Sequence, residues 1–219
     1  MTDRSTYANV ATLLALLLIA SGCGKSTTTA TGAVNRDTPK SVAKAFFQAT
    51  YDGDRKTAME CVTSGPMQAD LVEAMTVVSV GMRKATDAMF KRWGTKEIEQ
   101  SGGSFDVTRI DPRLIDQGKE TITGDTATIV TTKQTIHLAR GNDGWRIDLA
   151  RTFKLDEKTL AMAKPMFIAM GKAGEEVATE VEAGKYNNMA EGVNALKARI
   201  KQAIDAETKH LLENAPKPR

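Results

Sequence analysis

Residues 124–149 read GDTATIVTTKQTIHLARGNDGWRIDL, and this stretch decides the fold. Apolar side chains recur at every second position, as in strands that place one face on a core: Ala127, Ile129, Ile136, Leu138, Trp145, Ile147 and Leu149. The alternation changes parity around residues 132–134, and a turn or bulge near Lys133 explains the change. Residues 141–144 (GNDG) predict a hairpin turn, because glycine and asparagine tolerate positive φ. The stretch therefore predicts antiparallel strands, the last of which runs through Trp145, Ile147 and Leu149.

Upstream of this stretch, the apolar pattern predicts one more strand and three helices. Phe105–Ile110 (FDVTRI) alternates like a strand, which Asp111 and Pro112 end. The helices are expected over 39–52, with Thr38 as N-cap, over 55–62 and over 69–93. The apolar residues of the third helix form a narrow stripe: Leu71, Met75, Val78, Met82, Ala85 and Met89. This stripe is either a seam that faces the core, which we favour, or a soft methionine-lined binding groove.

After Phe153 the pattern is helical again. A helix opening at Asp156 or Glu157 should be kinked or restarted by Pro165 and loosened by the glycines of 171–174, and a further helix should cover 175–183. The last helix carries an apolar stripe: Met189, Val193, Leu196, Ile200, Ile204 and Leu211. Two interpretations stay open for this helix. It packs on its own chain, which we favour because the stripe spans only about three heptads, or it docks a protein partner through residues 189–211.

The composition excludes several classes of protein. The chain has 219 residues, 26% of them charged, with a net charge of +3. Its basic residues are scattered, so no stripe for nucleic acid is expected. Its two cysteines, Cys23 and Cys61, cannot form a disulfide framework, and Cys61 lies in an apolar helical pattern typical of a buried thiol.

The N-terminus resembles the signal of a bacterial lipoprotein. Val10–Ala20 (VATLLALLLIA) is eleven residues long, which is too short to span a bilayer but fits the apolar region of a secretory signal. The stretch ends in Ala20-Ser21-Gly22-Cys23, which resembles the lipobox that precedes a lipidated cysteine. The resemblance implies a diacylglyceryl group on the sulfur of Cys23, cleavage between Gly22 and Cys23, and a membrane contact made by lipid alone.

The residues that follow Cys23 predict a flexible tether up to residue 38, because they are rich in threonine, glycine and alanine. Gly24, rather than aspartate, after the cysteine resembles a signal for the periplasmic side of the outer membrane in hosts with two membranes. Residues 22–27 (GCGKST) look like a phosphate-binding loop, but the first glycine of that motif would fall at Ile19. Nucleotide binding is therefore not expected.

Four short motifs resemble the nuclear transport factor 2-like superfamily. They are Ala-Phe-Phe at 45–47, Tyr-Asp-Gly-Asp at 51–54, GDTATI at 124–129 and GWRID at 144–148. The resemblance covers roughly Pro39 to Phe153. It implies an α+β fold in which N-terminal helices pack on a curved antiparallel sheet, as in the nuclear transport factor 2-like and cystatin-like cone, followed here by a C-terminal helical extension. Such a cone encloses a pocket, for which Phe46, Met82, Met89 and Trp145 are candidate lining residues.

The same resemblance raises the question of catalysis, because some members of the superfamily are isomerases or dehydratases. His137 lies between Ile136 and Leu138, so it should point away from the core, and Asp106 and Asp148 should also lie on the polar face. No catalytic or metal-binding motif occurs, so no catalytic residue, metal or cofactor is expected beyond the lipid on Cys23.

These observations predict a non-enzymatic lipoprotein of the cell envelope that binds a small apolar ligand or a protein partner. The alternatives are a pocket enzyme of the isomerase or dehydratase type, and a structural module that presents its C-terminal helix to a partner. The expected organisation is a signal peptide over 1–22, a tether over 23–38, a nuclear transport factor 2-like domain over 39–153, a helical region over 154–215 and a tail over 216–219.

Overall fold

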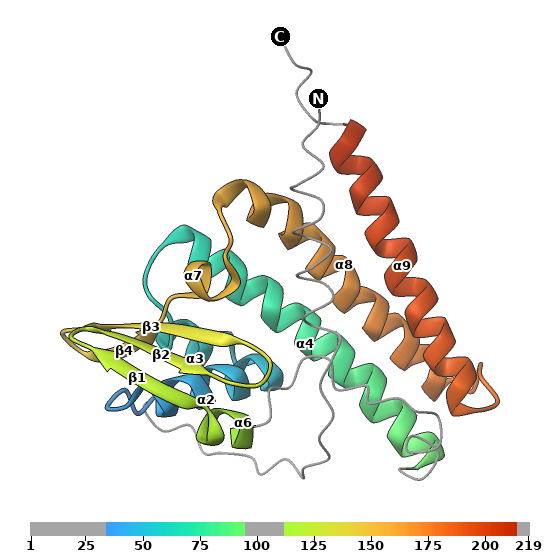
Figure 1. The fold of residues 1–219 in the computed structure, drawn as a ribbon. Helices are drawn as coiled ribbons and strands as arrows, with labels where there is room; N and C mark the ends of the chain where they lie inside the picture. The colour runs from blue at the N-terminus through green and yellow to red at the C-terminus, as the bar shows by residue number, and fades with distance from the viewer. Residues whose placement is uncertain (1–33, 95–111, 214–219) are drawn as a thin grey trace.

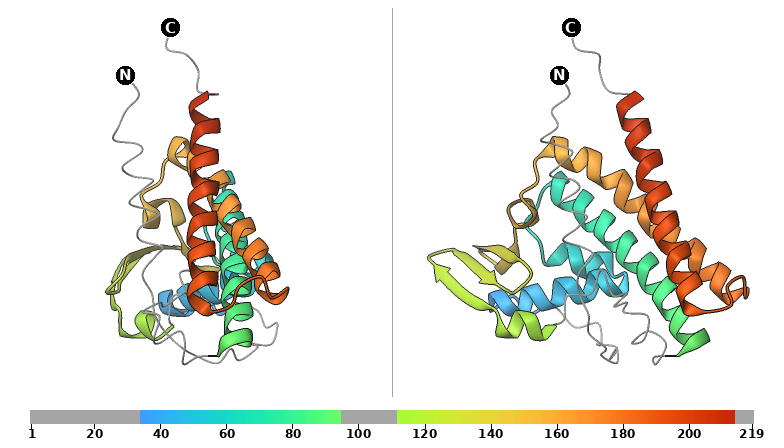
Figure 2. Two further views of the ribbon diagram at one scale, coloured as in Figure 1. Left: turned by 90° about the vertical axis from the view of Figure 1, so that its right-hand side faces the viewer. Right: turned by 45° about the vertical axis from the view of Figure 1, so that its right-hand side comes forward.

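The computed structural model describes residues 34–94 and 112–213, and this part of the chain has an α+β fold (Figure 1). Its helices are α2 (Pro39–Asp52), α3 (Arg55–Glu60), α4 (Pro66–Trp93), α6 (Pro112–Gln117), α7 (Leu149–Phe153), α8 (Glu157–Glu182) and α9 (Met189–Glu213). Its strands are β1 (Lys119–Thr123), β2 (Thr126–Val130), β3 (Thr135–Gly141) and β4 (Gly144–Ile147). Figure 1 and the right-hand view of Figure 2 place the sheet at one side of the molecule and α9 at the other.

The sheet is an antiparallel meander in the order β1-β2-β3-β4. The predicted change of parity near Lys133 is a turn between two strands, in which the Thr131 N–H donates to the Gln134 carbonyl at 2.9 Å. The predicted hairpin at 141–144 is confirmed, and Gly144 takes a positive φ of 109°. Ala127, Ile129, Ile136, Leu138, Trp145 and Ile147 all face the core, as the alternation predicts.

Three features of this region differ from the prediction. Leu149 is buried, but it begins α7 instead of ending β4, because the Asp148 carboxylate accepts a hydrogen bond from the Arg151 N–H at 3.0 Å and caps a helix there. Helix α6 and strand β1 were not predicted at all. The strand expected over Phe105–Ile110, which includes Asp106, lies outside the described residues.

The N-terminal helices begin and end close to their predicted positions. The Thr38 hydroxyl accepts a hydrogen bond from the Ser41 N–H, and Gly53 ends α2 in the left-handed region at φ 85°. Helix α3 ends at Glu60 instead of residue 62, and α4 begins at Pro66 instead of residue 69. The predictions of these three helices are confirmed apart from these ends.

Helix α8 corrects the prediction of a broken segment. It runs without interruption through Pro165 and through the glycines of 171–174, so the separate helix expected over 175–183 is its C-terminal part. Gly171 and Gly174 do not loosen α8 but let it approach α4: a Cβ atom at Gly171 would lie 2.5 Å from the Val77 carbonyl oxygen. Contact with α4 along the helix outweighs the local preference of proline and glycine to interrupt it.

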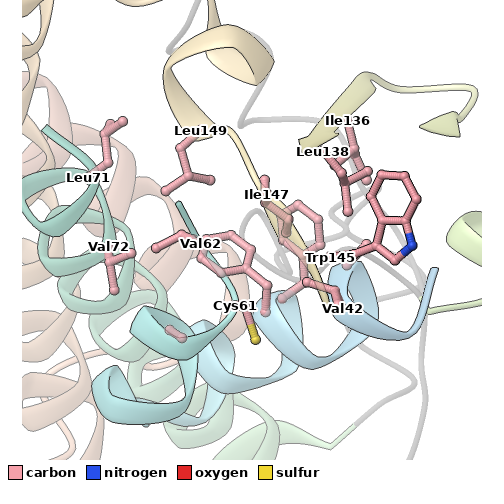
Figure 3. Packing of buried hydrophobic residues seen from close by; sticks show 14 of the residues in the cluster. Val42, Cys61, Val62, Leu71, Val72, Ile136, Leu138, Trp145, Ile147 and Leu149 are labelled. Atoms are coloured by element: carbon pink, nitrogen blue, oxygen red, sulfur yellow. The ribbon is translucent and has the colours of Figure 1, made fainter. Parts of the chain in front are cut away.

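Two clusters of buried side chains form the interior. The first lies between the sheet and the helices α2, α3 and α7, where Trp145, Ile147 and Val42 meet (Figure 3). The second lies among α4, α8 and α9. Helix α4 belongs to both, because its N-terminal half contributes Leu71 and its C-terminal half contributes Met89.

Helix α9 packs on α8 through its N-terminal half. Met189, Val193 and Leu196 are buried there, whereas Ile200 and Ile204 farther along are only partly buried. The favoured interpretation, packing on the same chain, is therefore confirmed for the first half of the helix. Among the described helices, none is both long enough and apolar enough to cross a membrane.

Candidate functional site

The predicted lipidation and cleavage residues, Cys23 and Gly22, lie outside the described residues. The described chain begins at Val34, which packs against the core of the sheet domain. The Arg36 carbonyl then accepts a hydrogen bond from the Trp145 N–H at 3.0 Å, and the Arg36 guanidinium binds Asp143 at 2.7 Å. The chain is thus fixed to strand β4 at Arg36, thirteen residues after Cys23.

The four predicted pocket residues are all buried, but they do not lie together. Phe46 and Trp145 belong to the core beneath the sheet, where Arg140 stacks over the Trp145 ring at 5.8 Å from its centroid. Met82 and Met89 belong to the core among the long helices. Each side chain is at most 3% exposed, so these residues contribute packing to two separate cores.

Cys61 is a buried free thiol, as its sequence pattern predicts. It packs beside Val62 and Ile147 in the core shown in Figure 3. Burial raises the pKa of the Cys61 thiol to about 12, because a thiolate there would lose its hydration. This cysteine therefore acts as a small apolar side chain.

His137 lies on the face of β3 opposite to Ile136 and Leu138, as predicted. It is half-buried rather than freely solvated, because α7 lies beside it. Its N–H donates to the Thr152 hydroxyl at 3.0 Å, and its carbonyl accepts from the Asp148 N–H at 2.9 Å. The Nδ1 atom of His137 is sealed from solvent and has no hydrogen-bond partner in the described part of the chain.

The charges around His137 come from the segment that forms α7. Burial, and then the positive charges of Arg151 and Lys154, lower the pKa of His137 below its usual 6.5, while Asp148 opposes the shift. Lys154 ends α7 in the left-handed conformation, with φ 53° and ψ 42°, and among residues 34–94 and 112–213 no other non-glycine residue has positive φ. A side chain in this region costs energy, so Lys154 is held there by its surroundings.

Glu120 is a polar residue that the sequence analysis did not single out. It pairs with Ile129, so it lies on the core face of β1, and its Oε2 atom is sealed without a partner in the described residues. The Nε2 atom of Gln134 is sealed in the same way. Within residues 34–94 and 112–213, no hydrogen bond links Glu120 to a second polar group, as general acid–base chemistry would need.

Other charged groups brace the long helices. Lys164 on α8 binds Asp70 at 2.6 Å and Glu73 at 3.0 Å, both on α4. Glu180 on α8 binds Arg199 on α9 at 2.6 Å and Lys185 in the connecting loop at 2.5 Å. These contacts fix the order α4, α8, α9 that Figure 1 shows.

No group of three or more metal-binding side chains occurs in the described part of the chain. Comparisons with protein families, with curated proteins and with solved structures found no match to this chain.

Proposed function

We propose that this chain is a bacterial lipoprotein of the cell envelope, cut before Cys23 and held at a membrane by acyl chains on that cysteine. The observation that carries the proposal is Ala20-Ser21-Gly22-Cys23 at the end of an eleven-residue apolar stretch. Each buried methylene contributes about 0.8 kcal/mol, so two or more acyl chains anchor a protein stably. In a host with two membranes, Gly24 favours the periplasmic side of the outer membrane.

The tether limits how far the folded part can stand from the bilayer. Val34 is the eleventh residue after Cys23 and the first described residue that packs on the core. A fully extended chain spans at most about 3.5 Å per residue, so Val34 lies within about 40 Å of the anchor. The protein therefore acts on molecules at or near the membrane surface.

Palmitate labelling in a bacterial host tests the anchor. Wild-type protein should incorporate labelled palmitate, and Cys23→Ala should incorporate none. Cys61→Ala is the matched control, because it removes the other cysteine of the chain and should still be labelled. Equal labelling of Cys23→Ala and wild type would contradict the proposal.

We further propose that residues 39–153 form a nuclear transport factor 2-like cone. Support comes from the antiparallel meander β1–β4, whose apolar face packs on α2 and α3. The helices α8 and α9 then extend the cone along α4.

Binding to a protein partner is the role that the packing favours over binding of a small apolar ligand. The four candidate pocket residues are already packed in two cores. Helix α9, by contrast, leaves Ile200 and Ile204 only partly buried at the edge of the second core, beyond the buried Met189 and Leu196. The part of α9 from Ile200 onward is therefore the surface that supports the proposal of a structural module presenting its last helix.

Site-specific photo-crosslinking in cells tests this surface. A crosslinker at Ile204 should capture a discrete partner, whereas one at Lys197, on the exposed face of the same helix, should not. Equal crosslinking at the two positions, or none at Ile204, would contradict a docking role for α9.

A pocket enzyme stays the second candidate function. The position of Glu120 favours it, because the Glu120 carboxylate lies on the core face of β1 with its Oε2 atom sealed from solvent. A reaction in the cone would need this carboxylate as acid or base. Any isomerase or dehydratase activity found in purified protein should then vanish in Glu120→Gln and persist in His137→Gln.

A further inference from the structure

The two edges of the sheet, β1 and β4, differ in how they are covered (Figure 1). At the edge of β4, the Trp145 N–H donates to the Arg36 carbonyl at 3.0 Å. The Ile147 N–H on the same edge donates to the Cys61 carbonyl at 2.8 Å. At the edge of β1, no segment of the described part of the chain makes such a backbone hydrogen bond. An uncovered edge is a surface on which a further strand can pair.

The register of the β1–β2 hairpin identifies the backbone groups that face this edge. Thr123 and Thr126 flank a two-residue turn, so they form the hydrogen-bonded pair that closes the hairpin. Bonded and outward-facing residues alternate along a strand. Thr121 therefore bonds to β2, whereas the N–H and C=O groups of Glu120 and Ile122 point outward.

The side chains of the same two outward residues lie on the core face of β1 but lack cover. Helix α2 packs across this face against β2 and β4, and Ile122 keeps 51% of its surface exposed. The Oε2 atom of Glu120 is sealed from solvent without a hydrogen-bond partner in the described residues, while its Oε1 atom is not among the sealed atoms. An exposed apolar side chain and an unpaired carboxylate thus lie two residues apart on one face.

A second copy of this chain does not complete the edge. Residues directly opposite each other in an antiparallel pair lie on the same face of the sheet. On its core face β1 carries only Glu120 and Ile122, so a second β1 offers Glu120 no cation in any register. An inward-pointing charge at an edge disfavours strands that cannot neutralise it. The strand that fits this edge therefore brings a basic residue.

We propose that the edge of β1 binds an extended segment of a partner protein whose sequence reads apolar–any–basic. The segment continues the antiparallel sheet, with its apolar residue opposite Ile122 and its lysine or arginine opposite Glu120. Main-chain hydrogen bonds to these two residues supply affinity, and the two side-chain contacts supply specificity. The sheet lies at the other side of the molecule from α9 (Figure 1), so this proposal does not depend on a docking role for α9.

A defined peptide tests the site on full-length ¹⁵N-labelled protein in detergent. The probe is acetyl-Thr-Thr-Ile-Thr-Lys-Thr-Thr-amide, and the control peptide has glutamate in place of lysine. The probe should bind saturably and slow the amide exchange of Glu120 and Ile122, measured by NMR, but not that of Thr121, which is already bonded to β2. The control peptide should bind about tenfold more weakly or worse, because it places like charges opposite each other.

Matched protein variants decide whether Glu120 recognises the lysine of the probe. Glu120→Gln should weaken binding about tenfold, because a contact between two charged groups is replaced by a weaker neutral one. Asp125→Asn is the matched control, because it removes an exposed carboxylate from the turn of the same hairpin, and it should bind like wild type.

Three results overturn the proposal. The first is the absence of saturable binding up to about 1 mM probe, which is weaker than a specific site of this kind requires. The second is equal affinity of Glu120→Gln and wild type for the probe. The third is slow amide exchange at Glu120 and Ile122 without peptide, because the protein then covers this edge by itself.

Discussion

Replacing Gly81 with alanine should force apart α4 and α8, the two longest helices in the described part of the chain. A Cβ atom at position 81 would lie 2.0 Å from the Gly171 carbonyl oxygen and 2.7 Å from its Cα. Both are backbone atoms, so no side-chain rotation relieves the clash. Helices α4 and α8 would have to separate by about 1.5 Å to restore an ordinary van der Waals distance.

The size of the effect follows from two opposing contributions. Overpacking of a core usually costs about 1–3 kcal/mol, and a backbone clash this close belongs at the upper end or beyond. Alanine is favoured over glycine inside a helix by about 1 kcal/mol, which offsets part of the cost. The free energy of unfolding should therefore fall by about 2 kcal/mol or more, through loosened packing of Met82 and Met170.

Urea denaturation followed by circular dichroism measures this loss. Gly192→Ala is the matched control, because its Cβ would meet only side-chain atoms, at 3.3 Å from the Trp93 ring and 3.5 Å from the Met89 methyl. These atoms can shift, so the gain in helix propensity should leave Gly192→Ala within about 1 kcal/mol of wild type. A Gly81→Ala protein as stable as wild type would refute the close α4–α8 contact.

Three further predictions concern single side chains. Lys154→Gly should raise the free energy of unfolding by about 0.5–1 kcal/mol, because glycine adopts a left-handed φ without strain. A lower free energy of unfolding than wild type, measured by urea denaturation, would contradict this prediction. Burial lowers the pKa of His137 below 6.5, so the unfolded state takes up a proton first as the pH falls. Stability should therefore decline from pH 6.5 down to the folded-state pKa, and His137→Gln should lack that part of the decline. At pH 8, a Cys61 thiol with a pKa of about 12 is ionised in about one molecule in 10⁴. Maleimide should accordingly label native protein about 10³-fold more slowly than urea-unfolded protein, and equal rates would place the thiol at the surface.

The elements that sequence predicts well carry their own local signals. Helix α2 has a hydroxyl cap at Thr38, a proline at its first position and a left-handed glycine after its end. The turn at 141–144 is specified by glycine and asparagine, and the strands around it alternate cleanly. The structure follows these signals because local preference and burial agree there.

The elements that sequence misses are those in which tertiary contacts decide. Strand β1 contains a single apolar residue, Ile122, which is 51% exposed, so no apolar period marks it. Pro165 and Gly171 are helix breakers locally, yet α8 continues through both because α4 lies against it. Leu149 keeps the parity of a strand, and only the capping carboxylate of Asp148 distinguishes the helix that forms.

The same distinction, between local sequence signals and tertiary contacts, applies to the candidate sites. Cys23 is identified by a contiguous motif, so the sequence alone predicts it. Helix α7, whose Thr152 hydroxyl accepts the hydrogen bond of the His137 N–H, is not predicted by the sequence. Glu120 was missed for the corresponding reason, because its strand β1 was not expected.

The most direct measurement of the central claim is the intact mass of the full-length gene product extracted from the membrane fraction of a bacterial host. We expect a chain that begins at Cys23, lacks residues 1–22 and carries the added mass of a diacylglyceryl group, with or without a third acyl chain on the new amine. A chain that still contains residues 1–22, or one that begins at Cys23 without any lipid, would contradict anchoring through this cysteine.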